Sequence, residues 1–338
     1  MTSLAWKLIK KSLRIYFRSK LNLIYNIYMK KRIVLAFGGN ALQKNGEVTA
    51  EAQKKIANEV GEIIYELSSK YEIVIAHGNG PQVGNILIHE ETGSSEKAPA
   101  MPLETAVAMS QGQIGYWLTQ AINNAFLAHG RQAKVATVVS QVVVSKSDPA
   151  FKNPTKPIGQ FYTEKEAKAL MREKGWTVKE DSGRGWRRVV PSPKPIDIVE
   201  KKTIMELIQD GVIVIAAGGG GIPVYKTKIL GRLKGVDAVI DKDYAAEKLA
   251  ELVKADVFVS VTAVPNACVK FGTPEQQALG EVAVDEIRQY LPEFKAGSML
   301  PKVEAAINFA KKGGTGIITD IDHLKDALKG KAGTIVTK

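Results

Sequence analysis

The stretch 212–248 constrains the fold of this chain more than any other part of the sequence. It contains the apolar run Val212–Ala217, the four glycines Gly218–Gly221, and Asp241-Lys242-Asp243 at the start of a helical pattern. An unbroken β-branched run is typical of a strand buried on both faces, as in parallel sheets covered by helices. Consecutive glycines leave backbone N–H groups free to approach an anion. A lysine between two aspartates at a helix start adds a mobile positive charge, and the combination indicates phosphate chemistry.

A strand, a glycine turn and a helix recur along the chain. Apolar runs at 32–37, 72–76 and 212–217 end at Gly38-Gly39-Asn40, at His77-Gly78-Asn79-Gly80 and at Gly218–Gly221. Because the carboxyl ends of parallel strands meet at one edge of a sheet, we expect the three turns to gather there. The pattern predicts a doubly wound α/β fold, with further strands at 134–144, 257–262, 316–319 and 334–337 and helices at 50–69, 82–90, 103–128, 164–174, 199–209, 279–290 and 297–309.

Residues 147–195 interrupt this alternation. Six prolines lie between positions 149 and 195, together with the glycine- and arginine-rich run 183–188. So many breakers disfavour a place in the central sheet and predict a small lid subdomain within a domain spanning 30–338. The arginines of the run, with Lys152 and Lys156, could grip an anion from this subdomain, although charged loops are usually only solvated.

The positive charge of the chain is concentrated at its N-terminus. The 338 residues carry a formal net charge of +12, but residues 1–32 contain nine Lys or Arg and no Asp or Glu. The rest is therefore only mildly basic, and the interleaved aromatic residues of RNA-binding surfaces are missing. We expect no nucleic-acid partner. The alternative, a basic protein that binds nucleic acid or membranes, requires salt-sensitive binding by residues 33–338 alone.

Residues 1–29 form a basic N-terminal extension with three interpretations. It is an upstream translation of a protein that starts at Met29, an organelle presequence, or an anchor on a membrane surface. The first is favoured because Met29 leads directly into the first core strand. No apolar run has the length of an integral membrane span.

Cys268 is the single cysteine of the chain. It cannot form an intramolecular disulfide, which fits a reducing compartment, and its apolar neighbours predict a small buried core residue. We expect a cytoplasmic location, or an organelle matrix if the basic extension is a presequence.

Two lysines beside the glycine turns are the candidate catalytic groups. Phosphoryl transfer depends on positioning and neutralising the moving group, and Lys242 and Lys302 from different parts of the chain are suited to it. Either lysine alone would be interpreted as a surface charge. Asp241 and Asp243 are either helix caps or carboxylates that hold the lysines and assist metal-nucleotide binding. His77 is expected to hydrogen-bond its own loop.

Other phosphate and metal motifs are missing from the sequence. There is no Walker-type loop, and Gly78–Gly84 is one residue too long for a dinucleotide fingerprint, which disfavours NAD. The histidines and Cys268 do not have metal-ligand spacing, so no protein metal site is predicted.

From about residue 30 to the C-terminus, the sequence resembles the carbamate kinases of the amino-acid kinase fold family. The resemblance rests on motifs that occur in one order: Phe37–Ala41, His77–Asn85, Pro99–Pro102, Gln111–Leu118, Phe151–Gly159, Gly183–Asp197, Gly218–Pro223, Ala238–Asp243 and Gly297–Lys302. Phe37 stands where the family more often has leucine, which is a conservative change.

This resemblance implies a three-layer α/β/α sandwich around a mainly parallel sheet, a protruding subdomain near 147–195, and a homodimer. It implies reversible phosphoryl transfer between carbamoyl phosphate and ADP, giving ATP and carbamate, with Mg²⁺ bound to the nucleotide. The pathway expected is arginine catabolism, with the reaction running toward ATP. The alternatives are the reverse direction, toward carbamoyl phosphate, or the phosphorylation of another small acid or phosphate.

The resemblance also assigns roles to residues. Lys242 and Lys302 would stabilise the transferring group, and Asp243 would orient them. Lys152 would reach the substrate, with Lys156 as the alternative. The carbamoyl phosphate side would be bound by Gly38, Gly39, Asn40, Gly78, Asn79, Gly219 and Gly220. The adenine nucleotide would be held by the loop 262–274, through Thr262, Ala263, Val264, Phe271 and Pro274, and by Met299.

Overall fold

The computed structural model describes residues 30–338, apart from 39–46, 48, 182 and 296. The basic extension 1–29 lies outside the described residues, as do Gly39 and Asn40 of the first glycine turn. The contacts divide the chain into Met1–Lys31 and Arg32–Lys338. The description below concerns the second of these units.

An eight-stranded sheet forms the centre of the described unit. Its strands are β1 (Lys31–Phe37), β2 (Tyr71–His77), β3 (Val135–Thr137), β9 (Ile213–Ile215), β12 (Val257–Thr262), β15 (Glu281–Ala283), β16 (Thr315–Asp320) and β17 (Thr334–Thr337). They are ordered β15-β17-β16-β12-β1-β2-β9-β3. The pairs β15–β17, β16–β12, β12–β1, β2–β9 and β9–β3 are parallel, and β16–β17 is antiparallel. The sheet is therefore mainly parallel, as predicted.

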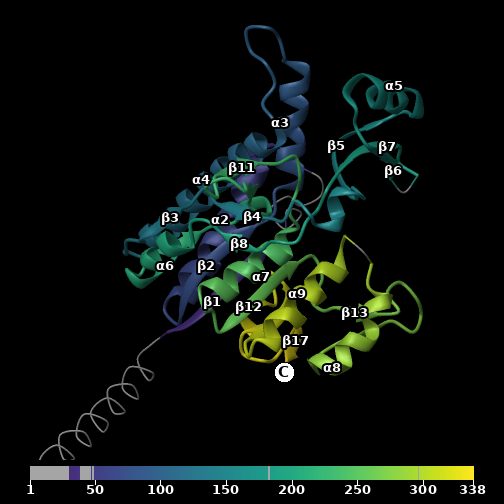
Figure 1. The fold of residues 1–338 in the computed structure, drawn as a ribbon. Helices are drawn as coiled ribbons and strands as arrows, with labels where there is room; N and C mark the ends of the chain where they lie inside the picture. The colour runs from purple at the N-terminus through teal and green to yellow at the C-terminus, as the bar shows by residue number, and fades with distance from the viewer. Residues whose placement is uncertain (1–29, 39–46, 48, 182, 296) are drawn as a thin grey trace, which may run out of the picture. The chain divides into compact units, whose positions relative to one another are not determined.

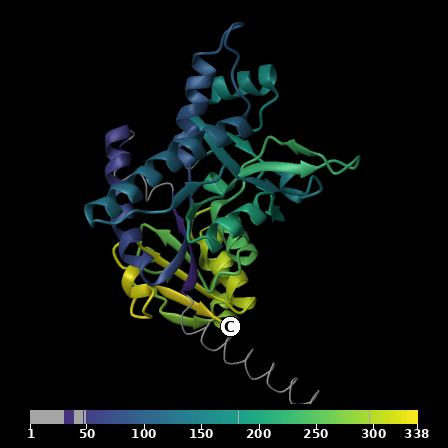
Figure 2. The ribbon, with the colours of Figure 1, turned by 90° about the vertical axis from the view of Figure 1, so that its left-hand side faces the viewer.

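Helices cover both faces of this sheet (Figures 1 and 2). Side chains of β1 alternate between two cores: Ile33, Leu35 and Phe37 enter one, while Val34 and Ala36 enter the other. The first core is completed by α2 (Ala50–Ser68), α4 (Leu103–Ala128) and α10 (Leu324–Ala327). The second is completed by α6 (Lys201–Gln209), α7 (Lys242–Leu252) and α9 (Met299–Lys311). This arrangement is a three-layer α/β/α sandwich.

The stretch expected to form a lid contains a separate three-stranded sheet. Strands β5 (Lys156–Tyr162), β7 (Trp186–Val190) and β6 (Val178–Glu180) pair antiparallel in that order, with α5 (Glu164–Lys174) between β5 and β6 in the chain. Ile158 and Val190 of this small sheet pack against Val83 and Leu87 of α3 (Gly80–Thr92). The small sheet is thus seated on the helix that follows the second glycine turn.

Two further sheets lie outside the central one. Strands β11 (Leu233–Gly235), β10 (Ile222–Lys226), β4 (Gln141–Val143) and β8 (Asp197–Ile198) form a four-stranded sheet, and β13 (Cys268–Val269) pairs with β14 (Gln277–Ala278). The apolar run 134–144 therefore supplies strands to two different sheets.

The helix predicted at 279–290 is confirmed only from Val284 onward and is wrong for the residues before it. This segment holds the edge strand β15, a single turn of α-helix, α8 (Val284–Ile287), and the 3-10 helix η5 (Arg288–Glu293). Val282 is buried, whereas its neighbours Glu281 and Ala283 are exposed, which is the alternation of a strand. The pairing of β15 with β17 fixes this extended conformation. The segment is therefore a strand because of a partner elsewhere in the chain, not because of its own residues. By contrast, α4 and α5 begin and end where the sequence predicted.

Candidate active site

The glycine turns after β1, β2 and β9 meet at one edge of the central sheet. Gly38, Gly78 and Gly219 all line one cavity of about 670 Å³, which is within the range of small-molecule sites. The convergence predicted from the three strand–turn–helix units is confirmed for the described residues. Gly39 and Asn40 lie outside those residues.

The third turn can be built only from glycine. Gly219 and Gly220 have φ values of 66° and 89°, in the left-handed region. A side chain on Gly219 would overlap the amide of Asn79, and one on Gly220 would overlap the carbonyl oxygen of Ile240. The run of four glycines thus lets three segments approach one another closely at the cavity wall. Gly219 lines the cavity, and Gly220 packs behind it.

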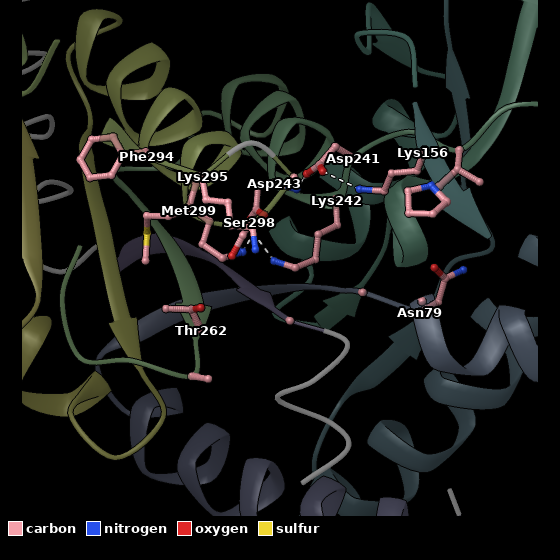
Figure 3. Close-up of a pocket in the computed structure, with 18 of the residues that line it drawn as sticks. Asn79, Lys156, Asp241, Lys242, Asp243, Thr262, Phe294, Lys295, Ser298 and Met299 are labelled. Carbon is pink, nitrogen blue, oxygen red and sulfur yellow. Dashed lines mark hydrogen bonds and ion pairs between the residues drawn. The ribbon is translucent and has the colours of Figure 1, made fainter. Parts of the chain in front are cut away.

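A single buried carboxylate, that of Asp243, holds two lysines in the cavity wall. Figure 3 labels Asp243 and one of these lysines, Lys242. The Nζ atom of Lys242 lies 2.8 Å from Oδ1 of Asp243, and the Nζ atom of Lys302 lies 2.9 Å from Oδ2. The hydroxyl of Ser260, on β12, donates a further hydrogen bond of 2.7 Å to Oδ1. Only 4% of the Asp243 side chain is exposed, against 14% for Lys242 and 12% for Lys302. Both ammonium groups therefore line the cavity on one fixed anion.

Burial and charge shift the pKa values of this cluster. Burial alone would raise the pKa of Asp243, but the charges and hydrogen bonds of Lys242 and Lys302 outweigh it and hold this pKa well below its usual range. Burial lowers the pKa of Lys242 to about 8, with the nearby ammonium of Lys302 contributing and Asp243 opposing. Asp243 is therefore ionised near neutral pH. Lys242 loses its proton at a pH only slightly above neutral.

The small sheet brings a third lysine to the cavity. Lys156, the first residue of β5, lines the cavity, and its Nζ atom lies 2.8 Å from Oδ2 of Asp241. Asp241 is the N-cap of α7, and its Oδ1 atom accepts a hydrogen bond of 3.0 Å from the backbone N–H of Asp243. The carboxylate of Asp241 thus joins the small sheet to the helix that carries Lys242.

Lys152 does not line this cavity. It is exposed and follows the 3-10 helix η3 (Pro149–Phe151). Of the two lysines considered from the sequence, the structure brings Lys156 to the cavity. The arginines of the run 183–188 form ion pairs, with Arg184 and Arg187 on Asp181 and Arg188 on Asp237.

The segment after β12 forms the other side of the cavity. Five of the six residues expected to hold the nucleotide line it: Thr262, Ala263, Val264, Phe271 and Met299. Pro274 does not. Residues that the sequence analysis did not single out also line this part: Asn266, Glu293, Phe294, Lys295 and Ser298. Cys268 belongs to the same wall and is partly exposed, so the prediction of a buried core cysteine is wrong.

His77 contacts its own loop, as predicted. It is 1% exposed, and its Nδ1 atom lies 2.9 Å from the carbonyl oxygen of Gly78. Burial lowers the pKa of His77 to about 4, and the hydrogen bond to Gly78 opposes this shift only in part. The ring is therefore neutral near pH 7 and supports the second glycine turn.

The cavity offers lysines and amides more than metal ligands. Within the described residues, no three His, Cys, Asp or Glu side chains gather in a group that could hold a metal ion. Both carboxylate oxygens of Asp243 are taken by ammonium groups. In the same part of the chain, no helix is both long and apolar enough to cross a membrane.

A mainly parallel sheet with lysines and glycine turns at its carboxyl edge defines a class of phosphotransferases. The sequence model of the amino acid kinase family matches residues 31–320, and the chain belongs to this family.

Within the family, the chain is similar to carbamate kinases. It is 53% identical over 317 residues to the carbamate kinase of Pyrococcus furiosus, covering 91% of this chain and 99% of that protein. It is 49% identical to carbamate kinase 1 of Enterococcus faecium, covering 92% of this chain and 100% of that protein. The structure of the carbamate kinase from Giardia lamblia bound to AMP-PNP matches with a TM-score of 0.86 and 43% identity, covering 91% of this chain and 99% of that chain.

Proposed function

We propose that this protein is a carbamate kinase, which transfers a phosphoryl group reversibly between carbamoyl phosphate and ADP to give ATP and carbamate. The observation that carries the proposal is the carboxylate of Asp243, which holds Lys242 and Lys302 together in the wall of a cavity where three glycine turns meet. The similarity to carbamate kinases at about half identity over nine-tenths of the chain supports this choice of substrate.

The two lysines neutralise the moving group. In the ATP-forming direction, an oxygen of the β-phosphate of ADP attacks the phosphorus of carbamoyl phosphate. The bond from this phosphorus to the carbamate oxygen breaks, and its electron pair leaves with carbamate. Charge on the phosphoryl oxygens is stabilised by Lys242 and Lys302, whose positions Asp243 fixes before the substrates bind. Preorganised charge of this kind needs no rearrangement during the reaction.

The two substrates occupy opposite sides of the lysine pair. In Figure 3, Asn79 and Lys156 lie on one side of Lys242, and Phe294 and Met299 lie on the other. Carbamoyl phosphate fits the first side. Gly78 and Gly219 line this side, and because they have no side chains, their backbone N–H groups can approach an anion. The second side, with apolar residues and the loop after β12, suits an adenine ring. The Giardia lamblia relative, whose structure contains AMP-PNP, supports a nucleotide site of this type.

Mg²⁺ is expected to accompany the nucleotide. Magnesium is usually held by phosphates, waters and one or two carboxylates, and it would neutralise charge between the phosphate groups. Asp243 does not fit as a direct ligand, because lysines occupy both of its oxygens. Both oxygens of Asp241 are likewise taken, by Lys156 and by the backbone N–H of Asp243. Glu293 also lines the cavity and is the carboxylate suited to contact the ion or its waters.

The physiological setting is a further part of the proposal. We infer a cytoplasmic enzyme of arginine catabolism that works toward ATP, and a homodimer. These inferences rest on the resemblance to carbamate kinases. Size measurement in solution tests the homodimer, and sequencing the N-terminus of the native protein tests whether residues 1–28 are present.

A coupled assay tests the activity itself. Purified protein is mixed with carbamoyl phosphate, ADP and Mg²⁺, and ATP formation is followed through hexokinase and glucose-6-phosphate dehydrogenase. We expect turnover with carbamoyl phosphate and far less with acetyl phosphate. A folded protein that forms no ATP from carbamoyl phosphate would refute the proposal, and a preference for acetyl phosphate would favour a kinase for another small acid.

A further inference from the structure

Helices α7 and α9 carry the lysine pair and Asp243, and they pack against each other. Helix α7 begins at Lys242, and Lys302 lies in the first turn of α9. Their side chains meet on the carboxylate of Asp243. The relative placement of the two helices therefore sets the separation of the two ammonium groups. Misplacement of a catalytic group by about 1 Å can cost about a hundredfold in rate.

A second side-chain link joins the same two helices outside the cavity. The hydroxyl of Tyr244 donates a hydrogen bond to Oε2 of Glu304. Tyr244 directly follows Asp243, and Glu304 lies two residues after Lys302, yet neither Tyr244 nor Glu304 lines the cavity. Successive residues of a helix point about 100° apart, so the two links leave each helix in different directions. Together they restrict rotation of the helices as well as their separation.

Lys194 covers this hydrogen bond. Its Nζ atom lies 3.1 Å from the ring centroid of Tyr244 and 3.6 Å from Oε2 of Glu304. The backbone N–H of Lys194 donates a hydrogen bond of 3.0 Å to Oδ2 of Asp148. Asp148 and Lys194 flank the segment that forms the small sheet and carries Lys156. The base of the small sheet is thus attached to the helix pair.

The hydroxyl of Tyr244 remains protonated near neutral pH. Burial is the main cause that raises the pKa of Tyr244 above its ordinary value, and the hydrogen bond and charge of Glu304 add to it. Because this hydroxyl keeps its proton near neutral pH, it suits a hydrogen bond that holds two helices in place and not a group that transfers protons.

We propose that the Tyr244–Glu304 hydrogen bond, covered by Lys194, is a positioning clamp that holds Lys242 and Lys302 at the separation required around the transferring phosphoryl group. The three residues of the clamp touch no reacting atom and act through the helices. This inference rests on the proposed function, because its effect is read in turnover.

The chain offers matched controls for each change. Lys312, which follows α9, pairs with Glu247 and Glu251 of α7 at 2.9 Å and 2.5 Å, outside the residues that line the cavity. Lys312→Met therefore removes a link between the same helices and leaves the clamp intact. Tyr225 has Lys146 Nζ 4.2 Å above its ring, so Tyr225→Phe is a comparable change at another tyrosine–lysine stack.

Steady-state kinetics of ATP formation test the clamp. We expect Tyr244→Phe to lower kcat about tenfold and to change either KM less than about twofold, because it disturbs the transition state and not binding. Glu304→Gln keeps an acceptor oxygen and should retain most of kcat, whereas Glu304→Ala should match Tyr244→Phe. The double variant with both Tyr244→Phe and Glu304→Ala should lose no more than either single variant, as expected for one shared interaction. Lys312→Met and Tyr225→Phe should keep the wild-type kcat.

Different results overturn different conclusions. If wild-type protein forms ATP and Tyr244→Phe keeps its kcat, the clamp is refuted and the proposed function stands. If Lys312→Met lowers kcat as much as Tyr244→Phe does, general loosening of the helix pair explains the loss, and the clamp is again refuted. If the wild-type protein itself forms no ATP, the proposed function fails and the clamp fails with it.

Discussion

The Nζ atom of Lys156 lies 2.8 Å from Oδ2 of Asp241, although 85 residues separate them in the chain. This contact brings a cation from the small sheet to the N-terminus of α7, beside the lysine pair. Lys156→Ala should therefore lower kcat/KM for carbamoyl phosphate by about tenfold to a hundredfold, as expected for a lost charged contact to a phosphate. Lys152→Ala is the matched control and should leave kinetics unchanged, since Lys152 is exposed away from the cavity. The reverse ranking in the coupled assay would contradict this assignment.

The lysine pair should carry most of the catalytic effect. Removal of one preorganised charge typically costs roughly 3 kcal/mol, or about a hundredfold in kcat. We expect this loss in Lys302→Ala, measured as kcat for ATP formation. Lys311→Ala, an exposed lysine on the same helix, should behave as wild type. Wild-type turnover in Lys302→Ala would exclude the cluster as the catalytic centre.

Activity should fall on the alkaline side. The pKa of Lys242 is lowered to about 8, mainly by burial, so its ammonium is lost as the pH rises through this value. The kcat/KM for carbamoyl phosphate, measured from about pH 6 to about pH 10, should decline above about pH 8. Lys242→Arg keeps its charge over this range, so its lower activity should lack this decline. A decline shared by both proteins would assign the titration to another group.

Asp243 should link stability to acid pH. Its folded-state pKa lies below the ordinary value of 3.8, so the folded protein binds this proton less readily than the unfolded chain. The resulting stabilisation is present above the ordinary value and is lost as the pH falls through the folded-state value. Asp243→Asn leaves two ammonium groups without their anion and should lower the free energy of unfolding at pH 7 by about 3–5 kcal/mol. In urea titrations, the difference in the free energy of unfolding between variant and wild type should become smaller at acid pH. If this difference is the same at every pH, the stabilisation is not ionic.

The third glycine turn should reject even a methyl group. Gly219→Ala places a Cβ atom against the amide of Asn79 at a φ of 66°, so both the turn and the substrate side should shift. We expect a loss of thermal stability and at least a tenfold loss in kcat/KM. Gly84→Ala, in α3, meets no atom within 4 Å and should preserve both quantities. Unchanged kinetics in Gly219→Ala would mean that close approach at this turn is unimportant.

Local patterns were sufficient to predict the layers of the fold and the convergence of the glycine turns. Apolar periodicity predicts which segments form buried strands and where helices such as α4 begin and end. The edge where the turns meet follows because parallel strands end on the same side of a sheet. The choice between Lys152 and Lys156 could not be made in this way. It depends on the pairing of β5 with β7, in which Lys156 lies opposite Val190. These two residues are far apart in the sequence, so the pairing cannot be predicted from local patterns.

Other features depended on partners far away in the chain. The strand at Glu281–Ala283 forms because β17 supplies its hydrogen bonds. The residues of the segment itself do not show that this partner is present. Cys268 has apolar neighbours but stands on a two-residue strand at the cavity wall. The link from Tyr244 to Glu304 spans 60 residues, so only the packing of α7 against α9 exposes it.

The position of β17 within the central sheet affects how the chain can be shortened. This strand lies between β15 and β16, so its backbone hydrogen bonds serve neighbours on both sides. A polypeptide cut before Thr334 would leave β15 without its partner in the sheet and would expose one edge of β16, which stays paired with β12 on its other edge. It would also open the apolar core around Val336 to water. Completion of the sheet during synthesis must therefore wait until residues 334–337 have emerged from the ribosome.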